Sequence, residues 1–86
     1  MSISFIKRIL DGDSKAVVEF YKYYSPKILF YLSKKLPRME DAQELTNDVF
    51  LEAIDSLSLL RREQSTTSWL YRIAHNKMVD FYRKRK

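Results

Sequence analysis

Apolar residues recur along this chain at steps of three and four, the spacing that places side chains on one face of an α-helix. The pattern predicts helices over about 3–10, 14–36, 41–57 and 67–86. One Gly and two Pro in 86 residues leave little room for tight hairpins. We therefore expect an all-α fold, a compact bundle of about four helices that ends in a long basic helix.

The first two helices are separated by Asp11-Gly12-Asp13, and Asp13 is placed to cap the second. Pro26 follows Ser25, so a new helix starts there or the existing helix kinks. Pro37 is expected to end the helix after Leu36. Apolar residues predicted to face the core are Ile3, Ile6, Ile9 and Leu10 in the first helix and Val17, Val18, Phe20, Tyr21 and Tyr24 in the second.

The third helix is predicted to have one buried and one acidic face. Asp41 and Glu44 have the spacing of an N-cap residue and its reciprocal partner. One face carries Ala42, Leu45, Val49, Ala53, Ile54 and Leu57, and the other carries Glu44, Asn47, Asp48, Glu52 and Asp55. We expect the second face to be exposed to solvent.

The fourth helix combines an apolar face with a polar stripe. Several N-caps are available at its start, from Ser65 to Ser68, and the pattern does not choose among them. The apolar face is Leu70, Ile73, Ala74, Met78 and Phe81, and the polar stripe is Arg72, Asn76, Asp80 and Arg83. Such a stripe has donors and acceptors for base edges or phosphates. Two roles are open for Asp80: its charge repels phosphate, or it pairs with Arg83 or Lys84 along the helix.

Charge is sorted into blocks. Residues 1–39 carry a balance of +5, residues 40–55 have six acids and no base, and residues 56–86 carry +6. Segregation of this kind suggests two partners of opposite sign. A basic block attracts a phosphate backbone, and an acidic block attracts a basic protein surface.

Several function classes are disfavoured. The chain has no Cys, no apolar run of about 20 residues, no Gly-rich phosphate loop and no nucleophile–His–acid set. Its one His, His75, lacks companions for a metal site and is expected to be solvated. We expect one small, cytoplasmic, non-enzymatic domain without cofactor, metal or membrane partner.

The strings DAQELTNDVFLEAIDSL and TSWLYRIAHNKMVDFYRKRK resemble region 2 of bacterial sigma factors of the extracytoplasmic-function (ECF) group. The upstream GDSKAVVEFYKYYSPKILFYL also fits, so the resemblance covers nearly the whole chain. Its most specific part is the run from Trp69 to Asn76; we expect Trp69 itself to be a core anchor rather than a wedge into DNA.

The resemblance implies a transcription initiation domain with two contact surfaces. The third helix would dock on the clamp coiled coil of the large subunit of core RNA polymerase through Glu44, Asn47, Asp48 and Glu52. The loop and last helix would recognise the non-template strand of the promoter −10 element. The DNA-binding candidates are Arg61, Arg62, Gln64, Ser65, Thr66, Thr67, Arg72, Asn76, Asp80 and Arg83. An anti-sigma factor is a further implied partner.

The loop of about 60–67 matches the segment that captures a flipped base in this group. Such a pocket needs edge hydrogen bonds and apolar or aromatic walls. Two positions at which the group often has aromatic residues are Leu60 and Thr66 here, and Arg62 replaces a usual Gly. The sequence thus differs from the group at positions that form the base-capturing pocket.

Two other functions remain open: a sigma-like module that binds polymerase or an anti-sigma protein without reading DNA, and a generic basic helix that binds nucleic acid or an anionic membrane. Family members also have a region 4, which reads the −35 element and is absent from these 86 residues. We therefore expect the chain to be part of a longer protein.

Overall fold

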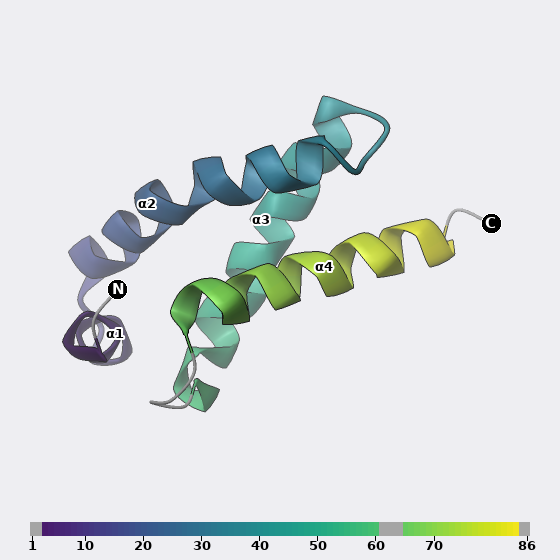
Figure 1. Cartoon of the computed structure of the whole chain (residues 1–86). Coiled ribbons are helices and arrows are strands. Elements are labelled where there is room, and N and C mark those ends of the chain that lie inside the picture. Colours follow the sequence, from purple (N-terminus) through teal and green to yellow (C-terminus); the bar gives the residue numbers. More distant parts are fainter. Residues whose placement is uncertain (1–2, 61–64, 85–86) are drawn as a thin grey trace.

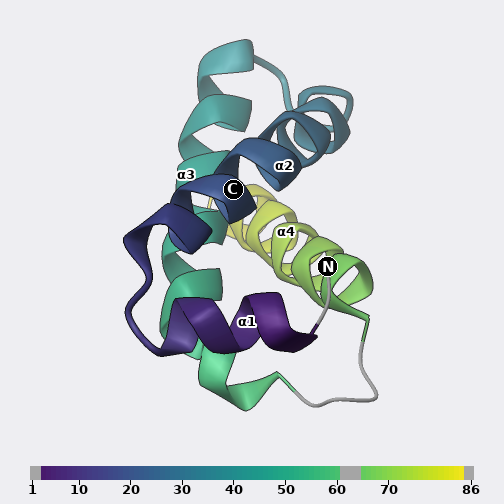
Figure 2. The ribbon, with the colours of Figure 1, turned by 90° about the vertical axis from the view of Figure 1, so that its left-hand side faces the viewer.

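The computed structural model describes residues 3–60 and 65–84 (Figure 1). Those ranges hold α1 (Ile3–Leu10), α2 (Ser14–Ser33), α3 (Met39–Ser56), a short 3-10 helix η1 (Leu57–Leu59) and α4 (Thr66–Lys84), with no strand among them. The expected all-α fold is confirmed. Both α2 and α4 pack on α3, and the two views place them on the same side of it (Figures 1 and 2).

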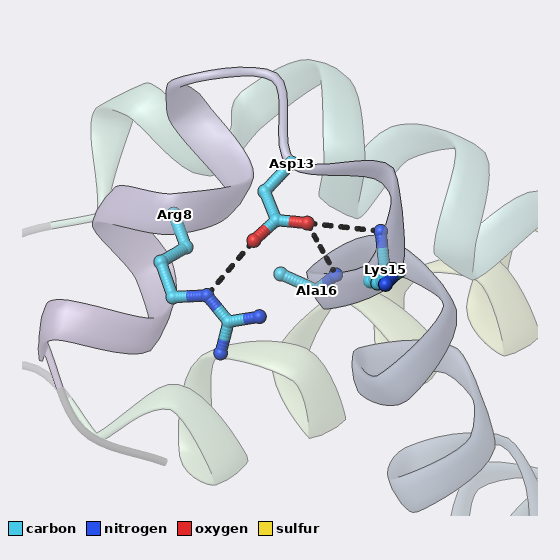
Figure 3. A network of polar contacts seen from close by, with 4 residues as sticks. All are labelled: Arg8, Asp13, Lys15 and Ala16. Atoms are coloured by element: carbon cyan, nitrogen blue, oxygen red, sulfur yellow. Dashed lines mark hydrogen bonds and ion pairs between the residues drawn. The ribbon is translucent and has the colours of Figure 1, made fainter.

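A short turn, held by several hydrogen bonds, connects α1 to α2 (Figure 3). Gly12 has φ +91°, a left-handed conformation that closes the end of α1. The Asp13 N–H donates to the Arg8 carbonyl, 3.0 Å away. One Asp13 carboxylate oxygen accepts from the N–H groups of Lys15 (3.0 Å) and Ala16 (3.3 Å), and the other accepts from Arg8 Nε at 2.9 Å. The predicted Asp13 cap is confirmed. The hydrogen bond from Arg8 has the largest effect in lowering the pKa of this carboxyl, and the hydrogen bond from the Ala16 N–H has the next largest.

The core face of α2 differs from the prediction. Its buried residues follow a strict four-residue step: Ala16, Phe20, Tyr24, Ile28 and Leu32. Val18 and Tyr21 were predicted to face the core but are 50% and 42% exposed. A four-residue step advances about 400° around a helix with 3.6 residues per turn, so each buried residue lies about 40° further round α2 than the one before it. Val18 and Tyr21 are not members of this series.

Of the two outcomes predicted at Pro26, a new helix or a kink in the existing one, the structure does not have the new helix. Pro26 is exposed and lies inside one continuous helix, which ends at Ser33 rather than at Leu36. Tyr24 and Ile28, on either side of it, are 1% and 0% exposed. Their packing in the core keeps the backbone helical although Pro26 has no backbone N–H to donate a helical hydrogen bond.

The start of α3 lies two residues before the predicted cap. Arg38 is the N-cap residue, in an extended conformation, and its carbonyl accepts from the Ala42 N–H at 3.2 Å. Asp41 lies in the first turn, is 6% exposed and pairs with Arg38 at 3.3 Å. An acidic side chain in the first turn stabilises the helix through its favourable interaction with the helix dipole, and it does not act as the N-cap. The predicted apolar face is buried except for the half-buried Ile54, and Phe50 adds to it.

The core brings all of these elements together. Phe20 lies against Tyr24 and Phe50, with ring centroids 5.3 and 5.7 Å apart. Leu70, Ile73 and Ala74 of α4 are buried in the same cluster, and Trp69 packs half-buried against it. The prediction that Trp69 anchors the core is confirmed.

Candidate functional site

The acidic face of α3 lies in solvent. Glu44, Asn47, Asp48, Glu52 and Asp55 are all exposed, as predicted from their spacing. Leu51, on the same helix, is 69% exposed. A large apolar side chain on this exposed face is a feature that sequence periodicity did not single out, and the core of a protein interface is more apolar than its rim.

Asn47 borders a hollow between α2 and α3. The Tyr21 hydroxyl donates to Asn47 Oδ1 at 3.5 Å, and the Tyr21 ring lies edge-on to Phe50. The hollow measures about 470 Å³ and is lined by Tyr21, Ser25, Pro26, Leu29, Gln43, Thr46 and Asn47. The exposed Tyr21 is therefore part of the surface that carries the candidate polymerase contacts.

A second hollow lies where the acidic face meets α4. It measures about 250 Å³ and is lined by Glu44, Leu45, Asp48, Lys77, Asp80, Phe81 and Lys84. Lys77 Nζ lies 2.9 Å from Glu52 Oε1 and so joins α4 to α3. The hydrogen bond to Glu52 raises the pKa of Lys77, and the charges of Glu52, Asp48 and Asp80 act in the same direction. Sequence reasoning missed Lys77, because nothing in the spacing says which helix its side chain meets.

The polar stripe of α4 is open to solvent. Arg72, Asn76, Asp80 and Arg83 are all exposed along one helix, as predicted. Asp80 lines the hollow with Lys77 and Lys84, and none of the ion pairs of residues 3–60 and 65–84 contains it. His75 is exposed as well, as expected for a solvated side chain.

The start of α4 uses most of its hydroxyl groups for folding. Ser65 is the cap among the four candidates, since its hydroxyl oxygen accepts from the Ser68 N–H at 3.3 Å. Thr66 is 8% exposed, and the Thr67 hydroxyl lies 3.0 Å from the buried Tyr24 hydroxyl. Arg61, Arg62 and Gln64 lie outside the described residues. The part of the loop that the structure does describe therefore presents fewer free hydrogen-bonding groups than the sequence suggests.

The described part of the chain contains neither a candidate metal site nor a membrane-spanning helix. Residues 3–60 and 65–84 contain no cluster of three or more His, Cys, Asp or Glu side chains that could hold a metal ion. Of the helices in these ranges, none is both long and apolar enough to cross a bilayer. The arrangement is one of two exposed polar surfaces on a helical scaffold.

Helix α3, with its acidic face, packs against the basic helix α4 in an all-α domain, and comparison with known proteins gives its family. The family model for sigma-70 region 2 matches residues 20–86. The chain therefore belongs to the sigma-70 region 2 family, and its relatives include proteins named as ECF RNA polymerase sigma factors.

Three bacterial proteins illustrate the relationship. The RNA polymerase sigma factor YlaC of Bacillus subtilis is 33% identical over 80% of this chain and 40% of its own length. The ECF RNA polymerase sigma factor SigW of the same organism is 28% identical over 94% of this chain and 43% of its own length. The RNA polymerase sigma-H factor of Pseudomonas aeruginosa is 30% identical over 83% of this chain and 37% of its own length. The chain thus spans about two fifths of the length of the curated relatives it matches.

Proposed function

We propose that this domain is the core-binding and promoter-binding part of a bacterial transcription initiation factor. The acidic face of α3 docks on the clamp coiled coil of the large subunit of core RNA polymerase. The polar stripe of α4, with the preceding loop, contacts the non-template strand of the −10 element. Such a role is carried out in the bacterial cytoplasm and needs no catalytic residue or cofactor.

The observation that carries the proposal is the exposure of Glu44, Asn47, Asp48 and Glu52 on one face of α3. Acids that folded into the interior would be unavailable to a basic partner. Asp48 lies about one helical turn before the exposed Leu51 in α3, so charge can steer a basic helix while the apolar side chain is buried on docking.

A pull-down with core RNA polymerase tests the docking surface. The charge reversal Glu44→Lys with Asp48→Lys should reduce capture by tenfold or more, because like charges then face a basic coiled coil. The matched control is Asp11→Lys with Glu19→Lys, which makes the same change of net charge at exposed positions outside α3. Equal capture of both variants would show that the acidic face is not the docking surface.

The DNA surface is tested separately, in a protein that also carries a −35-reading region. Arg72→Ala with Asn76→Ala should reduce initiation at the cognate promoter by about ten- to a hundredfold, while polymerase capture stays unchanged. The control is Lys7→Ala with Ser14→Ala on α1 and at the start of α2. Unchanged −10 selectivity in the first variant would contradict base reading by α4.

The second candidate function is a protein-only module that binds polymerase or an anti-sigma factor without reading DNA. The observation in its favour is the use of Thr66 and Thr67 in folding, since a base-capturing loop needs free hydrogen-bonding groups. This function predicts loss of binding on reversal of Glu44 and Asp48 but no loss of promoter selectivity on change of Arg72 and Asn76.

A further inference from the structure

A third exposed surface runs along α2 and is distinct from the acidic face of α3 and the polar stripe of α4. Tyr23, Lys27, Phe30 and Lys34, here called the α2 stripe, are spaced four, three and four residues apart and so share one side of the helix. Tyr23 is 54% exposed and Phe30 is 62% exposed. Single exposed apolar residues need no explanation, but two aromatic rings aligned with two lysines form a patterned surface.

Each ring of the α2 stripe has a lysine beside it. Lys27 Nζ lies 5.0 Å from the centroid of the Tyr23 ring, and Lys34 Nζ lies 4.3 Å from that of Phe30. Four lysines and no acid occur between residues 20 and 36. Two of these lysines, Lys27 and Lys34, belong to the α2 stripe, so the stripe carries two positive charges and is complementary to an anion.

The α2 stripe is held in place by α4. The Tyr71 hydroxyl donates to the Lys27 carbonyl at 3.5 Å, and the Tyr82 hydroxyl donates to the Lys35 carbonyl. The rings of Tyr31 and Tyr71 meet edge-on at 5.3 Å. These contacts fasten the α2 backbone next to α4, so the stripe has a fixed position beside the basic helix (Figure 1).

We propose that the α2 stripe binds single-stranded nucleic acid. Lys27 and Lys34 contact phosphates, and the exposed rings of Tyr23 and Phe30 stack on unpaired bases. Lysine–ring contacts are weak at exposed positions, so the ammonium groups are free to turn to phosphate when a strand binds. The two rings are seven residues apart, about 10 Å along the helix, which suits bases of one extended strand.

A single strand fits this surface better than a duplex or a membrane does. Lysines alone would suit any polyanion, whereas stacking requires base faces that are open, and these are closed inside a duplex. Neither a lysine nor a ring face distinguishes one sequence from another. The inference therefore concerns affinity for a separated strand and does not require that α4 reads the −10 element.

Fluorescence anisotropy with a labelled oligothymidine and the 86-residue chain tests the rings. Tyr23→Ala with Phe30→Ala should weaken binding by about 25-fold or more, because each of the two stacked bases is worth about fivefold or more. The matched control is Leu10→Ala with Val18→Ala, which removes two exposed apolar side chains outside the stripe. Unchanged oligothymidine affinity in the first variant, with its helical circular dichroism intact, would overturn the inference.

The lysines are tested by salt dependence. Lys27→Gln with Lys34→Gln should lower the slope of log affinity against log salt by about 1.4, since each phosphate contact on a single strand contributes about 0.7. Lys7→Gln with Lys15→Gln is the control of equal charge at exposed positions outside the stripe. Equal slopes for the two variants would overturn the phosphate contacts.

Two further probes separate this inference from the proposed function. Anionic phosphatidylglycerol vesicles should bind the wild type and the Tyr23/Phe30 variant equally; a loss as large as that for oligothymidine would make the stripe a membrane surface and overturn the inference. Core polymerase should capture the Tyr23/Phe30 variant as well as the wild type. Loss of that capture with oligothymidine binding intact would make the stripe a protein contact, also against the inference.

Discussion

Lys77 and Glu52 form an ion pair across the boundary between α4 and α3, with Nζ 2.9 Å from Oε1. This pair joins the helix that carries the candidate DNA contacts to the helix that carries the candidate polymerase contacts. The two side chains are 30% and 46% exposed, so the pair is open to competition from solvent ions and from a partner's charges. The two candidate surfaces therefore share an edge instead of lying on opposite sides of the domain.

Lys77→Gln should strengthen binding to core polymerase by about two- to fivefold. Lys77 neutralises part of the acidic face, and an exposed pair of this kind is worth up to about 1 kcal/mol. Titration of labelled polymerase with the domain measures the affinity. Arg72→Gln is the control, because it removes the same charge from α4 at an exposed position outside the hollow. If the two variants bind equally, the Glu52 pair has no influence on docking.

Tyr24→Phe should lower the free energy of unfolding by about 0.5–1.5 kcal/mol, the usual net value of one hydrogen bond. The ring of Tyr24 stays buried in this variant, and the contact with the Thr67 hydroxyl at 3.0 Å is lost. Urea denaturation followed by circular dichroism gives the value. Thr67→Val and the double variant complete the cycle, and strictly additive losses would mean that the two hydroxyls do not interact.

Gly12→Ala should lower the free energy of unfolding by about 1–2 kcal/mol, the cost of a left-handed conformation for a residue with a Cβ. No atom lies within 4 Å of the position that the added Cβ would occupy, so the whole effect comes from φ +91°. Gly12→Asn should lose less, because Asn tolerates this conformation. Thermal unfolding of the two variants side by side checks the order, and equal stability of Ala and Gly would be evidence against it.

Asp13 should make stability depend on pH in acid. Its pKa is lowered in the folded protein, so its contribution is complete at neutral pH and is lost as the pH falls through the folded pKa, below about 3.9. Asp13→Asn keeps a capping side chain but should show a weaker fall of Tm in that range. A pH series of melting curves measures it. Parallel curves for wild type and Asn would indicate that the Arg8 contact contributes nothing.

How far the sequence predicts this domain depends on the scale of the feature. Helix number, the exposed acidic face and the Asp13 cap follow from local spacing and capping chemistry, which short windows record. Local patterns could not choose between a new helix and a kink at Pro26, and they placed the cap of α3 at Asp41, because tertiary packing decides both: α2 stays helical between the buried Tyr24 and Ile28, and α3 begins after Arg38. The Lys77–Glu52 pair joins residues 25 positions apart on different helices, which no periodicity can indicate.

The four buried residues of α4, namely Thr66, Leu70, Ile73 and Ala74, all belong to its first half. Beyond Ala74 the helix is held by half-buried Met78 and Phe81, by the Tyr82 hydroxyl and by the Lys77 ion pair. Backbone amides of 70–74 should therefore exchange with deuterium slowly at any ionic strength, whereas those of 78–84 should exchange faster as added salt weakens the pair. The part of α4 that carries Asp80 and Arg83, two residues of the polar stripe, is thus the part whose rigidity responds to the ionic surroundings.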